Sequence, residues 1–353
     1  MRYLIDLQHP AHLHFFRNLA ARLIDEGHAV LLTGRNKDIL MTLAEEYGLD
    51  VKVLSTARGG LAFMALEVVQ HQARLMRIIR SFKPHAMMAI AGTFVGIPGF
   101  LTRTPTYVFY DTEHATISNL LAYPFATCVY VPDCYRKPIR WRHERYNGYH
   151  ELSYLHPNVF KPDPSVLEEA GLEQSQTFSI VRFVAWEAAH DRGLRGMTTR
   201  NKIRAVTELS RYGPVIVAAE GTLPQELEAH RCRLPASRMH HLMAHASLIF
   251  GESATMASEG AVLGVPGIYI DPVGRGYTDE QERDYGLVFN FTPKRQEQAI
   301  AKAVDILAAY DRNLWQERRR RLLAEKIDVN QLLNRVVRDQ PHWPPKRQVS
   351  GGP

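Results

Sequence analysis

Four short segments of the chain gather residues that could do chemistry. The first, His9-Pro-Ala-His12-Leu-His14, follows an apolar run and opens a helical pattern. The positive end of a helix attracts anions and lowers the pKa of a nearby imidazole, so a neutral histidine here could accept a proton. The spacing puts no histidine pair on one helical face, so no zinc site is expected. Capping or packing by one or two of these histidines is the alternative.

The second segment is Asp111-Thr-Glu113-His114, directly after a run of β-forming residues. Two acids and a histidine within four residues are costly to hold near a core without a purpose. We expect them to bind sugar hydroxyls or to act as acids and bases. The alternative is an N-cap at Asp111 with Glu113 in the first helical turn.

The third segment runs from Arg182 to Gly196 and contains Trp186, His190, Arg192 and Arg195. Its glycines let the backbone approach a ligand closely, and the two later arginines match phosphate oxygens. This segment is therefore predicted to face a pyrophosphate. The tryptophan would pack either on a ring of the ligand or in the core.

The fourth segment, residues 251–266, has a turn of small residues at Ser253, Ala254 and Thr255, and then Glu259 within a helical pattern. A strand that leads through such a turn into a helix directs backbone N–H groups and the positive helix end at its ligand, which suits a diphosphate. The carboxylate of Glu259 could accept two hydrogen bonds from a ribose diol. Its spacing from Ser253 is too long for a capping box.

Alternating strands and helices must position these segments. Strands are predicted at 3–7, 29–33, 51–54, 86–91, 106–109, 127–131, 178–183, 215–218, 248–250 and 267–270. Helices are predicted at 13–26, 39–47, 62–81, 198–212, 254–263, 296–309, 312–324 and 330–338. This alternation implies parallel pairing and right-handed crossovers, hence α/β doubly wound sheets. All four segments then lie beyond the carboxyl ends of strands, where such sheets bind ligands.

The length of 353 residues suits two domains of about 150 to 180 residues. A segment with three prolines predicts a linker at 151–164, between a Rossmann-like domain at 1–150 and a second one at 165–340. The ligand is expected in the cleft between them. The tail at 341–353, rich in Pro, Gly and basic residues, is predicted to be disordered.

Composition indicates a globular protein, with 45% apolar and 23% charged residues. No signal peptide or membrane-spanning run is visible, and three cysteines without metal-ligand spacing predict a cytoplasmic protein. The net charge of +6 is concentrated at Arg136–Arg145 and Glu317–Arg321. These segments could favour phosphate-rich ligands or peripheral contact with an anionic membrane leaflet, although a solvated helical face is the alternative for Arg318–Arg321. No nucleic-acid motif is present, so no DNA or RNA partner is expected.

The fourth segment resembles the nucleotide-sugar signature of the GT-B superfamily, which includes the UDP-N-acetylglucosamine 2-epimerases and the lipid II-forming glycosyltransferase. These enzymes have a serine-containing turn, a glutamate on the next helix and a Gly-x-Pro, here Ser253, Glu259 and Gly264-Val-Pro266. The resemblance implies that Glu259 binds the ribose and that the turn binds the diphosphate. The chain departs from the pattern at Ala254 and Thr255, where glycines are usual, and this affects how closely a phosphate can approach.

Further likenesses cover nearly the whole chain. His12 has the offset of the first-loop histidine of the lipid II-forming enzyme, Glu113-His-Ala resembles the epimerases' Glu-Ala-Gly, and His190-Asp-Arg192 is similar to their His-Arg-Arg-Glu. The chain most resembles a bacterial and archaeal family of GT-B-like proteins with no established reaction. Its members share His-Pro-Ala-His, Asp-x-Glu-His-Ala, His-Asp-x-Gly and Ser-Ala-Thr-Met. The resemblance implies a GT-B fold of two Rossmann-like domains that face each other across a cleft.

These resemblances favour a glycosyltransferase that moves a sugar from an NDP-sugar to an acceptor, lipid-linked or polysaccharide, in cell-surface synthesis. His12 would be the general base or a phosphate ligand, and Arg192, Ser253 and Thr255 would stabilise the leaving diphosphate without a metal or other cofactor. The remaining candidates for substrate binding are His9, His14, His114, Arg182, Arg195, Ala254 and Glu259.

Two alternatives stay open. One is an NDP-sugar 2-epimerase or hydrolase that uses Asp111, Glu113 and His190 as acids and bases. The lack of the epimerases' Gly-Gly, and of their Gln-Glu before Glu259, counts against it. The other is a non-catalytic protein that binds nucleotide-sugars. The base, the sugar, the acceptor and the oligomeric state are not determined by the sequence.

Overall fold

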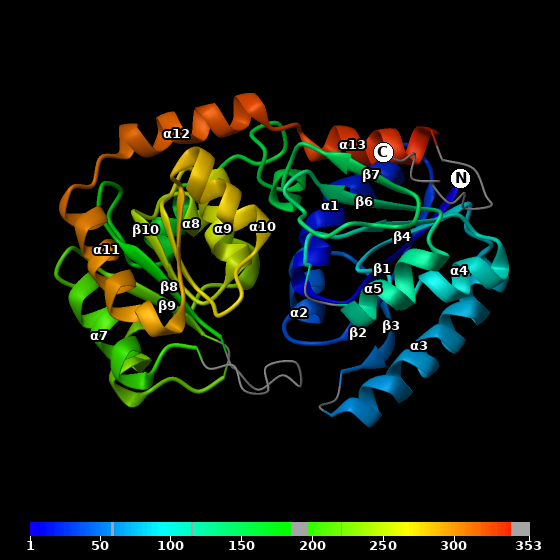
Figure 1. Cartoon of the computed structure of the whole chain (residues 1–353), viewed down its shortest axis with the longest axis horizontal. Coiled ribbons are helices and arrows are strands. Elements are labelled where there is room, and N and C mark those ends of the chain that lie inside the picture. Colours follow the sequence, from blue (N-terminus) through cyan, green and yellow to red (C-terminus); the bar gives the residue numbers. More distant parts are fainter. Residues whose placement is uncertain (58–59, 114–115, 185–195, 220, 340–353) are drawn as a thin grey trace. The chain divides into compact units, whose positions relative to one another are not determined.

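The computed structural model describes residues 1–57, 60–113, 116–184, 196–219 and 221–339. The chain forms two compact units (Figure 1): unit 1 comprises Met1–Tyr154 and the chain from Ile327 onward, and unit 2 comprises Leu155–Lys326. Each unit contains one parallel sheet with helices packed on it, which confirms the expected α/β class. Within the described ranges, no helix has the length and apolar character needed to cross a bilayer.

Unit 1 is built on a seven-stranded sheet of order β3-β2-β1-β4-β5-β6-β7. The strands are β1 (Arg2–Leu7), β2 (Ala29–Asn36), β3 (Val51–Thr56), β4 (Ala86–Ile90), β5 (Thr106–Phe109), β6 (Cys128–Pro132) and β7 (His143–Tyr146). Its helices are α1 (Pro10–Asp25), α2 (Leu40–Glu46), α3 (Leu61–Phe82), α4 (Gly96–Thr102), α5 (Thr116–Ala122), η1 (Tyr123–Phe125), η2 (His150–Ser153) and α13 (Val329–Asp339). Right-handed crossovers place α1 and α2 on one face of the sheet and α3, α4 and α5 on the other.

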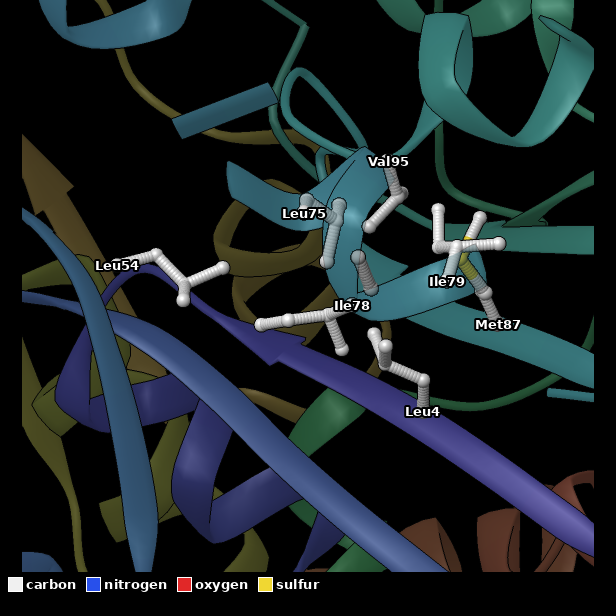
Figure 2. Packing of buried hydrophobic residues seen from close by; sticks show 8 residues of the cluster. Leu4, Leu54, Leu75, Ile78, Ile79, Met87 and Val95 are labelled. Atoms are coloured by element: carbon white, nitrogen blue, oxygen red, sulfur yellow. The ribbon is translucent and has the colours of Figure 1, made fainter. Parts of the chain in front are cut away.

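The core under α3 shows how the apolar pattern fixes this packing (Figure 2). Leu75, Ile78 and Ile79 follow the i, i+3, i+4 spacing of one helix face, and all three are buried. They pack on strand residues that include Leu4 of β1 and Met87 of β4. Burial of each such side chain stabilises the fold by roughly 1.5–3 kcal/mol, so this half of α3 is anchored firmly.

Unit 2 has a five-stranded parallel sheet of order β12-β11-β10-β8-β9. The strands are β8 (Ser179–Phe183), β9 (Val215–Ala219), β10 (Leu248–Gly251), β11 (Gly267–Ile270) and β12 (Val288–Phe291). Its longer helices are α7 (Thr199–Leu209), α9 (Ala254–Leu263), α11 (Gln296–Ala308) and α12 (Arg312–Glu325). The shorter ones are α6 (Ser165–Glu169), η4 (Gln225–His230), η5 (Ala236–Arg238), α8 (Met239–Met243), α10 (Gly276–Glu280), η6 (Gln281–Tyr285) and η7 (Pro293–Arg295).

The expected strands and helices are present, but two edge strands were not expected. β7 and β12 each have four residues and pair along one side only. The β7 sequence His-Glu-Arg-Tyr is polar, and both strands are too short to show a periodic pattern. The adjacent strands β6 and β11 supply their pairing in the sheet.

The expected division of the chain needs one correction, because the segment from Ile327 belongs to unit 1 and not to the second domain. The backbone N–H of Ile327 donates to the carbonyl of Asn147 at 2.8 Å. α13 then buries five apolar residues on α1 and η2: Val329, Leu332, Leu333, Val336 and Val337. The expected linker is divided after Tyr154, and the expected disordered tail at 341–353 lies outside the described residues.

The arginine run of α12 is not simply a solvated face. Arg319 Nε donates to the carbonyl of Val262 at 2.8 Å, and Arg318 Nη1 donates to that of Gly286 at 2.5 Å. Arg321 lies on the exposed side and pairs with Glu325 at 3.0 Å. Two of these arginines therefore donate to carbonyls near the ends of α9 and η6, and these bonds hold α12 on the rest of unit 2.

Gly251 ends β10 where its backbone lies very close to β8. A Cβ atom at this position would lie 2.0 Å from the carbonyl oxygen of Arg182, and its φ of 149° is strained for other residues. We expect Gly251→Ala to lower the free energy of unfolding by about 1–3 kcal/mol more than Gly171→Ala. Gly171 has a φ of 70° but open space around it, so it isolates the backbone effect. Equal losses in urea denaturation would contradict the close approach.

Candidate functional site

His12 lies in the first turn of α1, after β1. The backbone N–H of Gln8 donates to its Nδ1 at 3.2 Å, so the neutral ring carries its proton on Nε2. Burial, followed by the nearby His9 and His150, holds the pKa of His12 well below its ordinary value. The ring is therefore a neutral donor at Nε2. Of the two roles expected for His12, phosphate ligand fits this tautomer better than general base.

Asp111 and His150 form a carboxylate–imidazole pair at the carboxyl end of β5. Asp111 Oδ2 lies 3.2 Å from Nδ1 of His150 in η2, and Thr112 Oγ1 donates to Oδ1 at 2.9 Å. Burial lowers the pKa of His150, and the carboxylate opposes this only in part. A neutral ring with its proton facing Asp111 leaves the Nε2 lone pair available, and Nε2 is buried without a partner among the described residues. This is the arrangement of an oriented general base.

Glu113 is also withdrawn from water, with 2% of its surface exposed. Its Oε1 accepts a hydrogen bond from the backbone N–H of Arg136 at 3.3 Å and lies 3.6 Å from Nε of the same residue. Oε2 is buried and has no partner within the described ranges. Asp111 and Glu113 are thus engaged with His150 and Arg136, which is more than helix capping requires. His114 lies outside the described residues.

The other two histidines of the first segment make structural contacts. His9 is the N-cap of α1, and its Nδ1 accepts from the N–H of Ala11 at 3.2 Å. The buried ring of His14 stacks on Tyr154 with 5.3 Å between centroids and meets Tyr47 edge-on at 5.8 Å. That His9 and His14 bind substrate stays a prediction.

A buried polar network beneath these loops was not found from the sequence. Asp6, in β1, accepts from Thr33 Oγ1 at 2.8 Å and lies 3.0 Å from Nε2 of His71. The other ring nitrogen of His71 lies 2.8 Å from Ser55 Oγ, which donates to Glu67 Oε1 at 2.9 Å. This network ties β1, β2 and β3 to α3. An acid within an apolar strand and a histidine on the buried face of a helix were its two visible signals.

In unit 2, the sheet order reverses between β8 and β10, and the Ser253 turn follows β10. Ser253 is the N-cap of α9, and its Oγ accepts from the N–H of Met256 at 3.3 Å. The next two N–H groups, of Ala254 and Thr255, fall in the first turn of the helix, where no intrahelical acceptor is available. This end of α9 has the chemistry of an anion site.

Glu259 is buried in α9, and its Oε1 lies 2.8 Å from Nε2 of His240 in α8. His240 was not found from the sequence, because it lies in a different helix. The neighbouring Ser258 accepts a hydrogen bond from Gln281 Nε2 at 2.7 Å, which holds α9 on η6. The binding of ribose by Glu259 stays a prediction.

Glu252 is a second residue that the sequence did not reveal. Its buried carboxylate accepts from the backbone N–H of Val184 at 3.2 Å and of Met197 at 2.6 Å, and it pairs with Lys202 Nζ at 3.1 Å. It thereby joins the end of β8 and the approach to α7 to the Ser253 turn. Arg182 is half-buried in β8. Three other candidates, together with Trp186, lie outside the described residues: His190, Arg192 and Arg195.

We expect His12 and His150 to adopt opposite neutral tautomers at pH 7. The long-range ¹H–¹⁵N spectrum should show Nε2 protonated in His12 and Nδ1 protonated in His150. Asp111→Ala should lower the pKa of His150 further, because the carboxylate that raises this pKa is removed. A cationic ring at pH 7, or a proton on Nε2 of His150, would contradict the assignment of the base.

Solved structures with the same fold include two nucleotide-sugar epimerases and one glycosyltransferase. UDP-GlcNAc 2-epimerase from Neisseria meningitidis, bound to UDP-GlcNAc, has a TM-score of 0.68 at 9% identity and covers 96% of this chain and 99% of its own. The enzyme from Methanocaldococcus jannaschii has a TM-score of 0.66 at 10% identity, covering 96% and 100%. A spinosyn forosaminyltransferase has a TM-score of 0.64 at 14% identity, covering 97% and 100%. These likenesses confirm the GT-B-type fold.

Similarity in sequence leads to proteins whose activity is not established. An uncharacterised protein from Methanocaldococcus jannaschii is 32% identical over 134 residues, which are 36% of this chain and 38% of that protein. The chain thus matches well under two thirds of that relative's length. Residues 1–182 match the family described as protein of unknown function (DUF354), and they include His12, Asp111, Glu113 and His150. Since this match covers more than half of the sequence, the chain belongs to the DUF354 family.

Proposed function

We propose that this protein is a glycosyltransferase that takes a sugar from a nucleoside diphosphate donor and passes it to a hydroxyl acceptor. The observation that carries the proposal is the Asp111–His150 pair, with a buried Nε2 that has no partner in the described part of the chain. A protein that only binds nucleotide-sugars has no need of an oriented base. The GT-B-type fold, which epimerases and glycosyltransferases of known structure share, supports a nucleotide-sugar as the substrate.

In the proposed reaction, Nε2 of His150 takes the proton of the acceptor hydroxyl. The acceptor oxygen forms a bond to the anomeric carbon of the sugar, and the bond from that carbon to the diphosphate oxygen breaks. The N–H groups of Ala254 and Thr255 and the positive end of α9 stabilise the departing diphosphate. His12 donates Nε2–H to an oxygen of the substrate. The resemblance in sequence suggests an acceptor from cell-surface polysaccharide or glycolipid synthesis.

One observation favours a second candidate, an NDP-sugar 2-epimerase or hydrolase. Glu113 has a buried carboxylate oxygen without a partner among the described residues. Asp111 follows the same strand, β5, and pairs with His150. Epimerisation needs groups that remove and return protons, and two acids with one base would supply them. The two candidates differ in whether an acceptor is required.

Incubation without an acceptor separates these candidates. UDP-, GDP-, ADP- and CMP-sugars are mixed with the pure full chain and followed by ¹H and ³¹P NMR. We expect the donor that binds to remain unchanged over hours, because transfer lacks its second substrate. Rapid isomerisation of the donor, or its full conversion to free nucleoside diphosphate, would overturn the proposed transferase activity. The second candidate would be favoured if the His150→Gln change abolished that reaction.

We expect Glu259→Gln to weaken nucleotide binding by about 10- to 100-fold, because hydrogen bonds to a charged group contribute about 1.5–3 kcal/mol. Calorimetric titration of the full chain with the nucleotide that binds gives the affinity. His240→Gln is the matched control: it changes the partner of Glu259 but keeps the carboxylate. Unchanged affinity in a Glu259→Gln protein with wild-type melting would remove this residue from the site.

A further inference from the structure

The two halves of α3 differ in their surroundings. The second half packs into the core of unit 1 through Leu75 and the residues around it (Figure 2). The first half instead exposes four large apolar side chains, with Phe63 54%, Met64 42%, Leu66 52% and Val69 64% exposed. Exposed apolar side chains gathered on one short stretch of helix are a feature of interaction sites.

The same helix carries charge of one sign. Arg77 and Arg80 are exposed in the turns that follow the apolar half, and Lys83 caps the helix end. Arg74 is also exposed, but its Nη1 donates to the carbonyl of Leu54. The acid of α3, Glu67, is buried and accepts a hydrogen bond from Ser55. The exposed surface of α3 is therefore apolar at one end and cationic at the other, with no described acid to neutralise it.

The neighbouring helices on this face of the sheet continue the pattern. α4 packs against α3, and α5 packs against α4 (Figure 1). Neither helix contains Asp or Glu. Phe100, Leu101 and Leu120 expose more apolar surface, and Arg103 at the end of α4 adds another exposed cation.

We propose that the α3–α5 face of unit 1, defined by these apolar and basic residues, binds an anionic lipid surface. The apolar first half of α3 enters the boundary between headgroups and acyl chains, and the arginines contact the headgroups. Both the apolar side chains that leave water and the cations near an anionic leaflet contribute to binding of this kind. This inference is independent of the proposed transfer reaction.

The combination of features selects lipid over other occupants. An acidic protein would match the arginines but leave Phe63 and Leu66 without a reason to be exposed. An apolar protein surface would match those side chains, but it would offer no negative charge to the arginines of α3. A bilayer with anionic headgroups satisfies both along one helix. This surface is not one of the two basic segments for which the sequence suggested membrane contact. In one of those segments, Arg318 and Arg319 donate to backbone carbonyls of unit 2.

Vesicle flotation tests this surface with the full chain. We expect binding to vesicles that mix phosphatidylcholine with phosphatidylglycerol, and little binding to vesicles of phosphatidylcholine alone. The double change Phe63→Ser with Leu66→Ser should reduce binding about tenfold or more. Arg77→Gln with Arg80→Gln should reduce binding and weaken its dependence on salt.

Two matched controls keep the result specific. Leu314→Ser changes an exposed apolar residue of α12, and Arg140→Gln changes an exposed cation of the Arg136–Arg145 segment. Both should bind like the unaltered chain, and all variants should keep its melting temperature because the altered side chains are exposed. Failure to bind anionic vesicles, equal binding to neutral ones, or a greater effect of Arg140→Gln would overturn the proposal. Self-association without lipid that Phe63→Ser and Leu66→Ser abolish would assign this face to a second copy instead.

Discussion

Carboxylates withdrawn from water must be paired, and this constraint governs the strand ends of both units. An unpaired buried charge costs several kcal/mol, so each acid recruits a cation, an imidazole or backbone N–H groups from another element. In unit 1 this holds for Asp6 with His71 and for Asp111 with His150. In unit 2, Glu252 gathers two backbone N–H groups and a lysine. The pairs hold the loops at the carboxyl ends of the strands, where parallel sheets bind ligands.

Burial and pairing also determine the tautomers of two histidines, His12 and His150. Burial keeps both rings neutral, since it lowers the pKa of His12 and of His150. The partner at Nδ1 then selects the tautomer: a backbone donor in the first case and a carboxylate acceptor in the second. One ring is left with a hydrogen to donate and the other with a lone pair. Two residues of the same type can therefore serve as electrophile and base in one protein.

Local sequence patterns sufficed for the alternation of strands and helices, and for the positions of Asp111, Glu113 and the Ser253 turn directly after strands that are visible from their apolar residues. They did not suffice where a role depends on a partner far along the chain. His150 pairs with a residue of another strand end, His240 lies 19 residues from Glu259, and Glu252 reaches a backbone group 68 residues away. The packing of α13 on unit 1 also depends on residues far along the chain. The apolar stripe of α13 predicts that one helix face is buried, but it does not indicate which surface covers that face.

The central claim, that the turn at the start of α9 holds the diphosphate of a nucleotide-sugar, is tested most directly by amide chemical shifts. The full chain, labelled with ¹⁵N at alanine and threonine, is titrated with nucleoside diphosphates and their sugars. We expect the amides of Ala254 and Thr255 to shift most among the labelled positions, because their N–H groups would donate to the phosphate oxygens. Binding that leaves these two amides unmoved, or no binding of any such nucleotide at millimolar concentration, would contradict it.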